Sequence, residues 1–280
     1  MISRVVTVAA ALHYTDAEKA ASWQTSSGCR VIQEVSQKLS GEAIILMYHH
    51  CAPLPPQAAI RGLYVTPRQF AWQMDWLRRR NVRFCTLNDL QEAEAAAPRR
   101  PRVVVTFDDG LRDVYENAFP MLAERRIPAV VFPVVGDIGK SDVVWDENKD
   151  KSPQSLMSEA QIREMADAGT EFGSHLWEHR NASRLAPVEL REQLTRSRNE
   201  LARITGRATT SIAYPYGDYS AEVLAETARA GYRYGVTTKE GSNRGVPLLE
   251  LRRHAIKGVS LLHPLRFIRT MRRALAAART

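Results

Sequence analysis

The sequence predicts an α/β protein built on a parallel sheet. Strand-like and helical segments alternate about seven times between residue 43 and the end of the chain. The strand-like segments are apolar throughout, which is typical of strands covered on both faces by helices. A barrel and an open doubly wound sheet both fit this pattern, because each covers a parallel sheet in this way.

The first half of the chain supplies four expected strands, at residues 43–48, 82–87, 103–107 and 129–134. Thr66 and Pro67 are typical of a helix start, as an N-cap followed by a first-turn proline. Phe70, Met74 and Leu77 continue that helix with an apolar stripe. Two shorter helices are expected at 88–97 and 118–125.

The second half begins with a long polar loop at 136–157, followed by a helix that Ser158 and Gln161 open as a capping box. Gly169 is expected to end that helix. The remaining expected strands are 171–174, 211–214, 234–238 and 249–256, and the remaining helices are 187–204, 221–230 and 264–278.

Composition places the chain among globular proteins. Its 280 residues are 44% hydrophobic and 25% charged, which excludes a disordered chain, a collagen-like chain and a coiled coil. We expect residues 1–40 to form an irregular N-terminal extension and residues 41–280 to form one catalytic domain. No apolar run approaches the roughly 20 residues of a transmembrane helix.

The chain is basic, with a formal net charge of +8. Its arginines fall in separate clusters at 78–80, 99–102 and the C-terminal tail, a distribution that favours solvated faces over a nucleic-acid groove. The odd set of three cysteines favours reduced thiols and a cytoplasmic protein over a secreted or periplasmic one. Residues 5–12 are too short and too weakly apolar for a convincing signal segment.

Polar side chains follow several expected strands, where parallel α/β folds place their active sites. His49, the pair Asp108 and Asp109, His175, and the pair Pro215–Tyr216 all stand at such strand ends. Two adjacent carboxylates diverge at a strand end, so one can bind a cation while the other handles a proton. A single aspartate there would be explained as a helix cap, but two in a row are less expected.

His175 and His179 lie four residues apart, a spacing that brings two imidazoles to one face of a helix or tight turn. Seven histidines in the chain make such a pair a weak signal by itself. Combined with a strand-end aspartate, the pair forms an Asp-His-His set. That set suits one divalent cation with positions left open for water and substrate.

Three ordered segments resemble the motifs of NodB-type polysaccharide deacetylases, the family 4 carbohydrate esterases. They are Thr106-Phe107-Asp108-Asp109-Gly110, Gly173-Ser174-His175 with His179, and Ala213-Tyr214-Pro215-Tyr216-Gly217. The resemblance covers roughly residues 43–258, and it is the combination in this order that is specific. It implies a distorted (β/α)7 barrel, the NodB homology domain, and metal-dependent removal of N-acetyl groups from amino sugars.

The resemblance also implies roles for individual residues. Asp108 resembles the general base, and Asp109, His175 and His179 resemble the metal ligands. The backbone amide of Tyr216 would contribute to the oxyanion hole. The cation is expected to be Zn²⁺, with Co²⁺, Ni²⁺ and Mn²⁺ as alternatives.

The chain departs from the family at the arginine that orients the base, where it has Ala213. We expect Arg253 to replace it, because Arg253 shares the parity of Leu249 and Leu251 on the last strand, whereas Arg252 has the opposite parity. The general-acid candidates are His263, His254 and His49, and the expected substrate contacts are His49, Pro215 and Trp145, an aromatic residue of the long loop.

The sequence therefore predicts a hydrolase that removes acetyl groups from N-acetylglucosamine-containing oligo- or polysaccharides. Within the family, the alternatives are a deacetylase of Nod-factor-like chitooligosaccharides or of an exopolysaccharide precursor. A non-catalytic carbohydrate-binding barrel is the alternative from another class. Nucleic acid is not an expected partner.

Overall fold

The computed structural model describes residues 35–56, 58–91, 100–145, 153–258 and 263–278. Parallel strands form its main sheet in the order β10-β1-β5-β6-β7, and β4 pairs with the first residues of β5. These strands are β1 (Ala43–Tyr48), β4 (Arg83–Phe84), β5 (Arg102–Asp109), β6 (Ala129–Pro133), β7 (Glu171–Phe172) and β10 (His254–Ala255).

Two further strands close this sheet into a ring. β8 (Ser211–Ala213) and β9 (Tyr234–Val236) pair with each other in parallel. The bridge Ser174↔Ile212 joins them to the end of β7, and the bridge Val236↔Leu251 joins them to the segment before β10. The predicted α/β class is confirmed, and the ring settles the alternative in favour of a barrel. Because the two links are single bridges, the barrel is distorted there.

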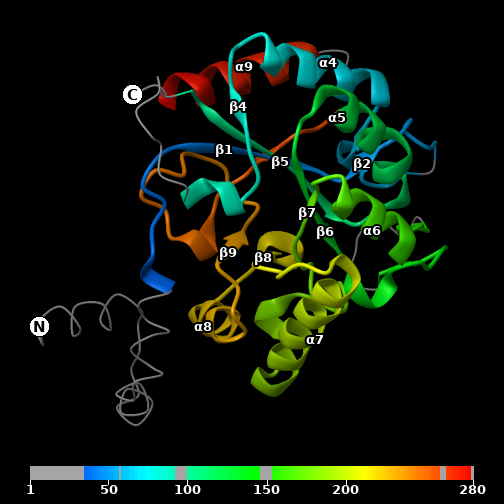
Figure 1. Cartoon of the computed structure of the whole chain (residues 1–280), viewed down its shortest axis with the longest axis vertical. Helices are drawn as coiled ribbons and strands as arrows, with labels where there is room; N and C mark the ends of the chain where they lie inside the picture. Colours follow the sequence, from blue (N-terminus) through cyan, green and yellow to red (C-terminus); the bar gives the residue numbers. More distant parts are fainter. Residues whose placement is uncertain (1–34, 57, 92–99, 146–152, 259–262, 279–280) are drawn as a thin grey trace, which may run out of the picture.

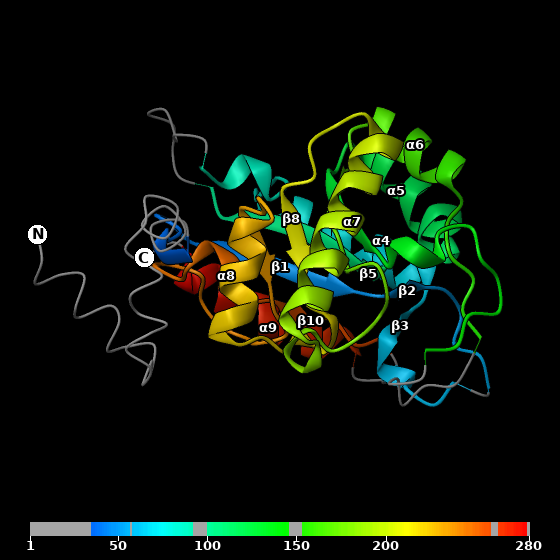
Figure 2. The same cartoon turned by 90° about the horizontal axis from the view of Figure 1, so that it is seen from below.

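Helices surround the barrel (Figures 1 and 2). α4 (Pro67–Arg78) and α9 (His263–Ala277) lie on one side, and α7 (Pro187–Thr205) and α8 (Ala221–Arg229) lie on the other. α5 (Phe119–Arg125) and α6 (Glu159–Asp167) complete the cover near β6 and β7. Among the helices described, none combines the length and apolar composition needed to cross a bilayer.

The shorter elements lie in the connections. Two-residue strands β2 (His50–Cys51) and β3 (Tyr64–Val65) pair in parallel beyond the end of β1. The short helices are η1 (Arg61–Leu63), η2 (Asn88–Gln91), the π-helix η3 (Val114–Ala118), η4 (Val135–Asp137), η5 (Ala182–Arg184), η6 (Pro215–Gly217) and η7 (Leu248–Glu250).

Helix starts follow the predicted capping chemistry. The Thr66 side chain accepts a hydrogen bond from the Gln69 amide, and the Gln69 side chain accepts one from the Thr66 amide, which completes a capping box on α4. Ser158 and Gln161 form the predicted capping box on α6 in the same way. These local hydrogen bonds satisfy amides that have no partner within the helix.

The prediction is wrong over most of 249–256, where a single strand was expected. Residues 248–250 form the 3₁₀ turn η7, and β10 contains only His254 and Ala255. The expected strand at 82–87 is reduced to Arg83–Phe84, whereas the strand expected at 103–107 extends through Asp109. The helix expected at 118–125 begins earlier, with the π-turn η3 at Val114. The part of the expected helix at 92–97 lies outside the described residues.

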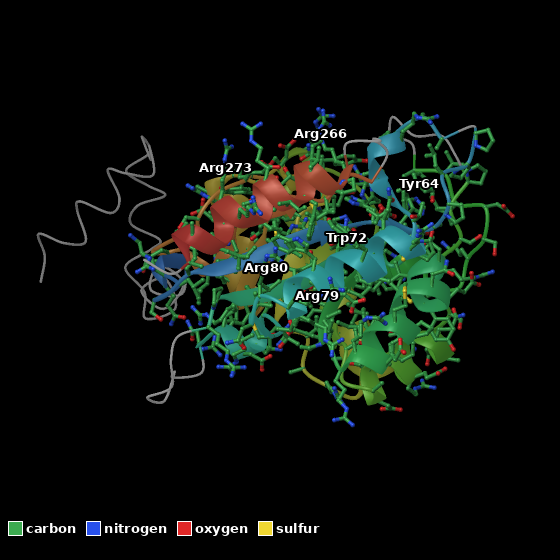
Figure 3. The ribbon with its side chains drawn as sticks, turned by 90° about the horizontal axis from the view of Figure 1, so that it is seen from above. Tyr64, Trp72, Arg79, Arg80, Arg266 and Arg273 are labelled. Atoms are coloured by element: carbon green, nitrogen blue, oxygen red, sulfur yellow. The ribbon has the colours of Figure 1, made fainter. Side chains whose placement is uncertain are left out.

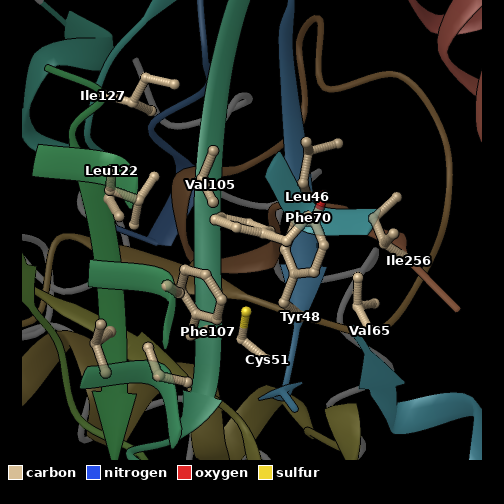
Figure 4. Packing of buried hydrophobic residues seen from close by; sticks show 14 of the residues in the cluster. Leu46, Tyr48, Cys51, Val65, Phe70, Val105, Phe107, Leu122, Ile127 and Ile256 are labelled. Carbon is tan, nitrogen blue, oxygen red and sulfur yellow. The ribbon is translucent and has the colours of Figure 1, made fainter. Parts of the chain in front are cut away.

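Alternation along β1 and β5 divides the core into two layers. Ile44, Leu46 and Tyr48 face outward and pack under the helices, together with Val105 and Phe107 of β5 (Figure 4). The residues between them face into the barrel, where the interior cluster includes Ile45, Val104, Val130, Phe132 and Tyr234. Asp108 has the same parity along β5 as Val104, so its side chain points toward the barrel interior.

The first described residues pack onto the domain. Leu39 is buried in the interior cluster, and its amide donates to the carbonyl of Val246. The ordered domain therefore includes Leu39, which lies within the predicted extension 1–40. Residues 1–34 lie outside the described part of the chain, so the irregular extension stays a prediction for them.

Candidate active site

The end of β5 sends two neighbouring carboxylates in different directions. Asp108 and Asp109 are both buried within the strand. Asp109 has a left-handed φ of 71°, and Gly110 follows with a φ of 76°. A β-carbon at Gly110 would lie 2.4 Å from Cβ of Pro133, so only glycine fits this turn. The turn rotates Asp109 away from Asp108 and toward the end of β7.

His175 and His179 lie in the loop that follows β7 rather than on a helix. The His175 amide donates to the carbonyl of Pro133, which ties this loop to the end of β6. The Nε2 atoms of His175 and His179 lie 3.5 and 3.6 Å from the same oxygen, Oδ1 of Asp109. The structure thus brings together the three residues predicted as metal ligands.

The Nδ1 atoms of both imidazoles already have hydrogen-bonding partners. Nδ1 of His175 lies 2.7 Å from the carbonyl oxygen of Ala213, to which it can only donate. Nδ1 of His179 lies 3.0 Å from the hydroxyl of Tyr216. A proton on Nδ1 leaves the Nε2 lone pair available to a cation, the usual arrangement behind a metal-binding histidine.

The donor set fits a divalent cation. One ligand atom from each of Asp109, His175 and His179 lies within 4.8 Å of the others. Burial lowers the pKa of both histidines, so both imidazoles are neutral at pH 7, as metal ligation requires. Two nitrogens and one carboxylate oxygen match the ligand type of catalytic zinc sites.

Arg253 holds the other carboxylate. Its Nη1 and Nη2 atoms donate to the two oxygens of Asp108 at 2.6 and 2.7 Å, and Nε donates to the carbonyl of Thr237. Arg253 is completely buried, whereas Arg252 is exposed. Arg253, rather than Arg252, is thus the arginine that contacts Asp108, and its role in orienting the base stays a prediction. The strand parity used to predict it was wrong in part, because Leu249 belongs to the turn η7.

The two carboxylates differ in electrostatics as well as direction. Burial alone would raise the pKa of Asp108, yet the Arg253 guanidinium lowers it to about 2. Burial raises the pKa of Asp109 to about 8, with a further contribution from the charge of Asp108. Asp108 is therefore ionised through the physiological range. Asp109 is a buried carboxylate without a permanent counter-charge, which is the deficit that a bound cation would correct.

His49 completes the interior of the site. Its Nε2 atom lies 4.0 Å from Oδ2 of Asp108, and its side chain is partly exposed. Burial lowers its pKa to about 4, against the opposing effect of Asp108. Of the three histidines predicted as candidate acids, His49 is the one that the structure places beside the base.

Of the other two acid candidates, His254 lies outside the site. His254 pairs with Leu46 in the middle of β1, next in the chain to the inward-facing Arg253. The carboxylates that act on its pKa are Glu240 and Glu42, neither of which belongs to the site. His263 begins α9, and its side chain lies outside the described residues.

Aromatic side chains surround His179. The ring of Trp145 lies 4.7 Å from that of His179, and its Nε1 donates to Asp137. Trp145 is buried, so it forms a wall of the site rather than an exposed sugar platform. Pro215 and Tyr216 lie in η6 on the other side, where Tyr216 has a φ of 62° and its ring packs edge-on to His179.

Asp113 supports the two residues that follow His49, a contact that the sequence did not predict. Asp113 accepts a hydrogen bond from the Cys51 amide with one oxygen, and its other oxygen lies 2.6 Å from Nδ1 of His50. The His50 ring stacks on Tyr64 at 3.9 Å. The signal available in the sequence was the second histidine after β1, together with an acid four residues after Asp109.

The fold and the site together define a parallel α/β barrel that carries an Asp-His-His set able to hold a cation beside an ionised carboxylate. The family model for polysaccharide deacetylases matches residues 95–235. The chain belongs to this family.

Individual relatives agree with this assignment. The chain is 28% identical over 200 residues to YxkH of Bacillus subtilis, covering 71% of this chain and 65% of YxkH. It is also 28% identical to the poly-β-1,6-N-acetyl-D-glucosamine N-deacetylase of Staphylococcus aureus, over 65% of this chain and 63% of that protein. Among solved structures, the Streptococcus pyogenes deacetylase PplD in complex with acetate matches with a TM-score of 0.70 at 26% identity, over 83% of this chain and 99% of PplD. The chain spans less than two thirds of the length of the two sequence relatives.

Proposed function

We propose that this protein is a metal-dependent N-deacetylase that hydrolyses the acetamido groups of an N-acetylglucosamine-containing polysaccharide. The observation that carries the proposal is the placement of two neighbouring carboxylates. Asp109 faces His175 and His179, while Asp108 is held by Arg253. A protein that only bound glycans would have no need for a cation site and an ionised base side by side.

The cation would be held by Asp109, His175 and His179. When bound, a divalent ion such as Zn²⁺ supplies Lewis acidity, which polarises the acyl carbonyl and lowers the pKa of water. Tyr216 and the carbonyl of Ala213 orient the two imidazoles for this role through their Nδ1 atoms.

Asp108 acts as the general base toward the attacking water. Arg253 keeps the carboxylate ionised and fixes its plane with two parallel hydrogen bonds. This pairing also weakens the base, so the arrangement depends on a water whose own pKa is lowered. General base catalysis of this kind typically contributes a factor of ~10²–10⁴ in rate.

The developing oxyanion is assigned to the backbone amide of Tyr216, in the left-handed turn of η6. We assign the donor to the leaving amine to His49, because it lies 4.0 Å from Asp108. His49 is neutral in the free site, since its pKa is lowered to about 4. It must therefore gain its proton during turnover, and the proton that Asp108 takes from water is the nearest source. Water and the acetamide then yield acetate and a free amine.

The relatives support one substrate class. The Staphylococcus aureus relative is a poly-β-1,6-N-acetyl-D-glucosamine N-deacetylase. We therefore propose a β-1,6-linked poly-N-acetylglucosamine as the preferred substrate, ahead of chitooligosaccharides and exopolysaccharide precursors.

Acetate release from defined glycans tests this proposal. The protein, reconstituted with Zn²⁺ or Co²⁺, is incubated with β-1,6-linked and β-1,4-linked N-acetylglucosamine oligomers, with the Asp108→Asn variant as control. We expect metal-dependent acetate release from the wild type, faster with the β-1,6 oligomers, and none above background from the variant. Glycan binding without acetate release from any oligomer would favour the non-catalytic barrel instead.

A further inference from the structure

A basic face lies on the side of the barrel covered by α4 and α9. It consists of six arginines at the end of α4 and along α9, which are Arg79, Arg80, Arg266, Arg269, Arg272 and Arg273. Five of these side chains are exposed, Arg80 is partly exposed, and α9 contains no acidic residue. Arg79 and Arg80 lie beside α9, whose outer edge carries Arg266 and Arg273 (Figure 3).

Aromatic packing fixes this face in place. Phe267 of α9 contacts Trp72 and Trp76 of α4 edge-on, with ring centroids 5.8 and 5.6 Å apart. The Arg80 guanidinium lies 3.2 Å above the Trp76 ring and donates to the Trp76 carbonyl. The arginines are therefore presented by two helices that are joined rigidly through a buried aromatic layer.

The basic face differs from the opposite side of the barrel in how its charges are paired. No acidic side chain in the described part of the chain forms an ion pair with any of the six arginines. Burial lowers the pKa of Arg80, and the nearby guanidinium groups of Arg272 and Arg79 lower it further. On the opposite side, by contrast, Arg191, Arg203 and Arg229 each pair with a glutamate.

Most of the basic face also lies away from the reaction. In a βα barrel each helix runs back from the carboxyl ends of the strands, where Asp108 lies. The starts of α4 and α9 are close together, since the Gln69 side chain donates to the carbonyl of Gly258, just before α9. Arg79 and Arg80 at the end of α4, with Arg272 and Arg273 in the second half of α9, therefore lie toward the far end of the barrel, whereas Arg266 lies near the start of α9 (Figure 3).

We propose that the basic face binds the anionic phospholipid surface of a membrane. An N-acetylated glycan carries no negative charge, and its deacetylated product is cationic, so neither the substrate nor the product of the proposed function would bind here. Guanidinium groups bind phosphates through paired hydrogen bonds. Leu265 is 64% exposed beside Arg266, which adds an apolar contact at the edge of the same face. Two helices lying side by side fit a flat headgroup layer better than a single narrow ligand.

Vesicle co-sedimentation of the full chain tests this proposal. The wild type is compared on vesicles of phosphatidylcholine alone and on vesicles that also contain phosphatidylglycerol. The test variant is the double substitution Arg269→Gln with Arg273→Gln. Each basic residue near such a surface contributes about fivefold in affinity, so we expect the double variant to bind roughly thirtyfold more weakly.

The matched control removes the same charge elsewhere. Arg207 and Arg244 are exposed and lie outside the basic face, so Arg207→Gln with Arg244→Gln should change vesicle binding less than threefold. Circular dichroism checks that both double variants are folded, and both should keep wild-type acetate release from a soluble oligomer. Equal weakening by both pairs would mean that net charge alone is responsible, and would overturn the proposal. Binding to soluble polyphosphate but not to vesicles would overturn it in favour of an acidic polymer.

Discussion

The cation side and the base side of the site are built in opposite ways, although they begin at adjacent residues. On the cation side, Asp109 faces two neutral imidazoles, and burial raises its pKa to about 8. On the base side, Asp108 is neutralised by a buried guanidinium that arrives from a segment 145 positions further along the chain. One carboxylate is therefore prepared to receive a cation, whereas the other already has its charge partner.

The difference arises from a single backbone turn at Asp109. Regular alternation points Asp108 into the barrel toward Arg253, and the left-handed φ of Asp109 turns the next carboxylate toward the β7 loop. Substitutions on the two sides should consequently fail differently. Loss of a cation ligand removes the metal, and loss of the base or its partner leaves the metal in place.

The largest effect is expected on the cation side. Replacing His175 or His179 with alanine removes one of three ligands, so metal affinity should fall by more than the roughly 10–100-fold typical of supporting contacts. Acetate release should fall with it. Equilibrium dialysis with elemental analysis measures the metal, and His254→Ala serves as a control histidine outside the site. Wild-type metal affinity in both variants would contradict the assignment.

The next effect belongs to the base. Asp108→Asn is nearly isosteric and should fold, but it cannot accept the proton of the attacking water. We expect turnover to fall by ~10²–10⁴-fold, measured as acetate release at saturating metal. A variant that retained more than a tenth of wild-type turnover would show that another group is the base.

Arg253 should matter for both turnover and stability. Arg253→Ala leaves Asp108 buried without its partner, which should cost about 3–5 kcal/mol in unfolding free energy. Arg253→Lys keeps the charge but loses the paired hydrogen bonds, so it should remain folded with its metal and turn over more slowly. Chemical denaturation and acetate release measure the two effects.

The exposed neighbour provides the comparison for Arg253. Arg252→Ala should leave both stability and turnover close to wild type, because the Arg252 side chain is exposed. Equal effects at positions 252 and 253 would mean that the Asp108 ion pair does not orient the base.

A smaller effect is expected at Asp113, which contacts the two residues that follow His49. Asp113→Asn weakens the contacts to His50 and to the Cys51 amide, so we expect a loss of about 1–3 kcal/mol in unfolding free energy. Turnover should fall less than in Asp108→Asn, while metal content stays at the wild-type level. Loss of metal in this variant would instead place Asp113 on the cation side.

The predictability of the two sides follows from the same contrast. The alternation of apolar strand-like segments with helical ones predicted the α/β class. Asp109, His175 and His179 could be found from strand ends and a short spacing. The Arg253–Asp108 pair depends on closure of the barrel, which local sequence does not encode. The 3₁₀ turn at 248–250 could not be told from a strand by composition, because Leu248 and Leu249 are as apolar as strand residues but bury their side chains from a 3₁₀ helix. Trp145 was ambiguous for a related reason, since its burial depends on contact with Asp137 and His179.

The division of labour between the neighbouring carboxylates is tested most directly by metal stoichiometry in a matched pair of variants. Asp108→Asn and Asp109→Asn are purified without metal, incubated with Zn²⁺ and measured by elemental analysis beside the wild type. We predict one bound equivalent in the wild type and in Asp108→Asn, and a large loss in Asp109→Asn. Retention of the metal by Asp109→Asn, together with its loss from Asp108→Asn, would contradict the account and exchange the two roles.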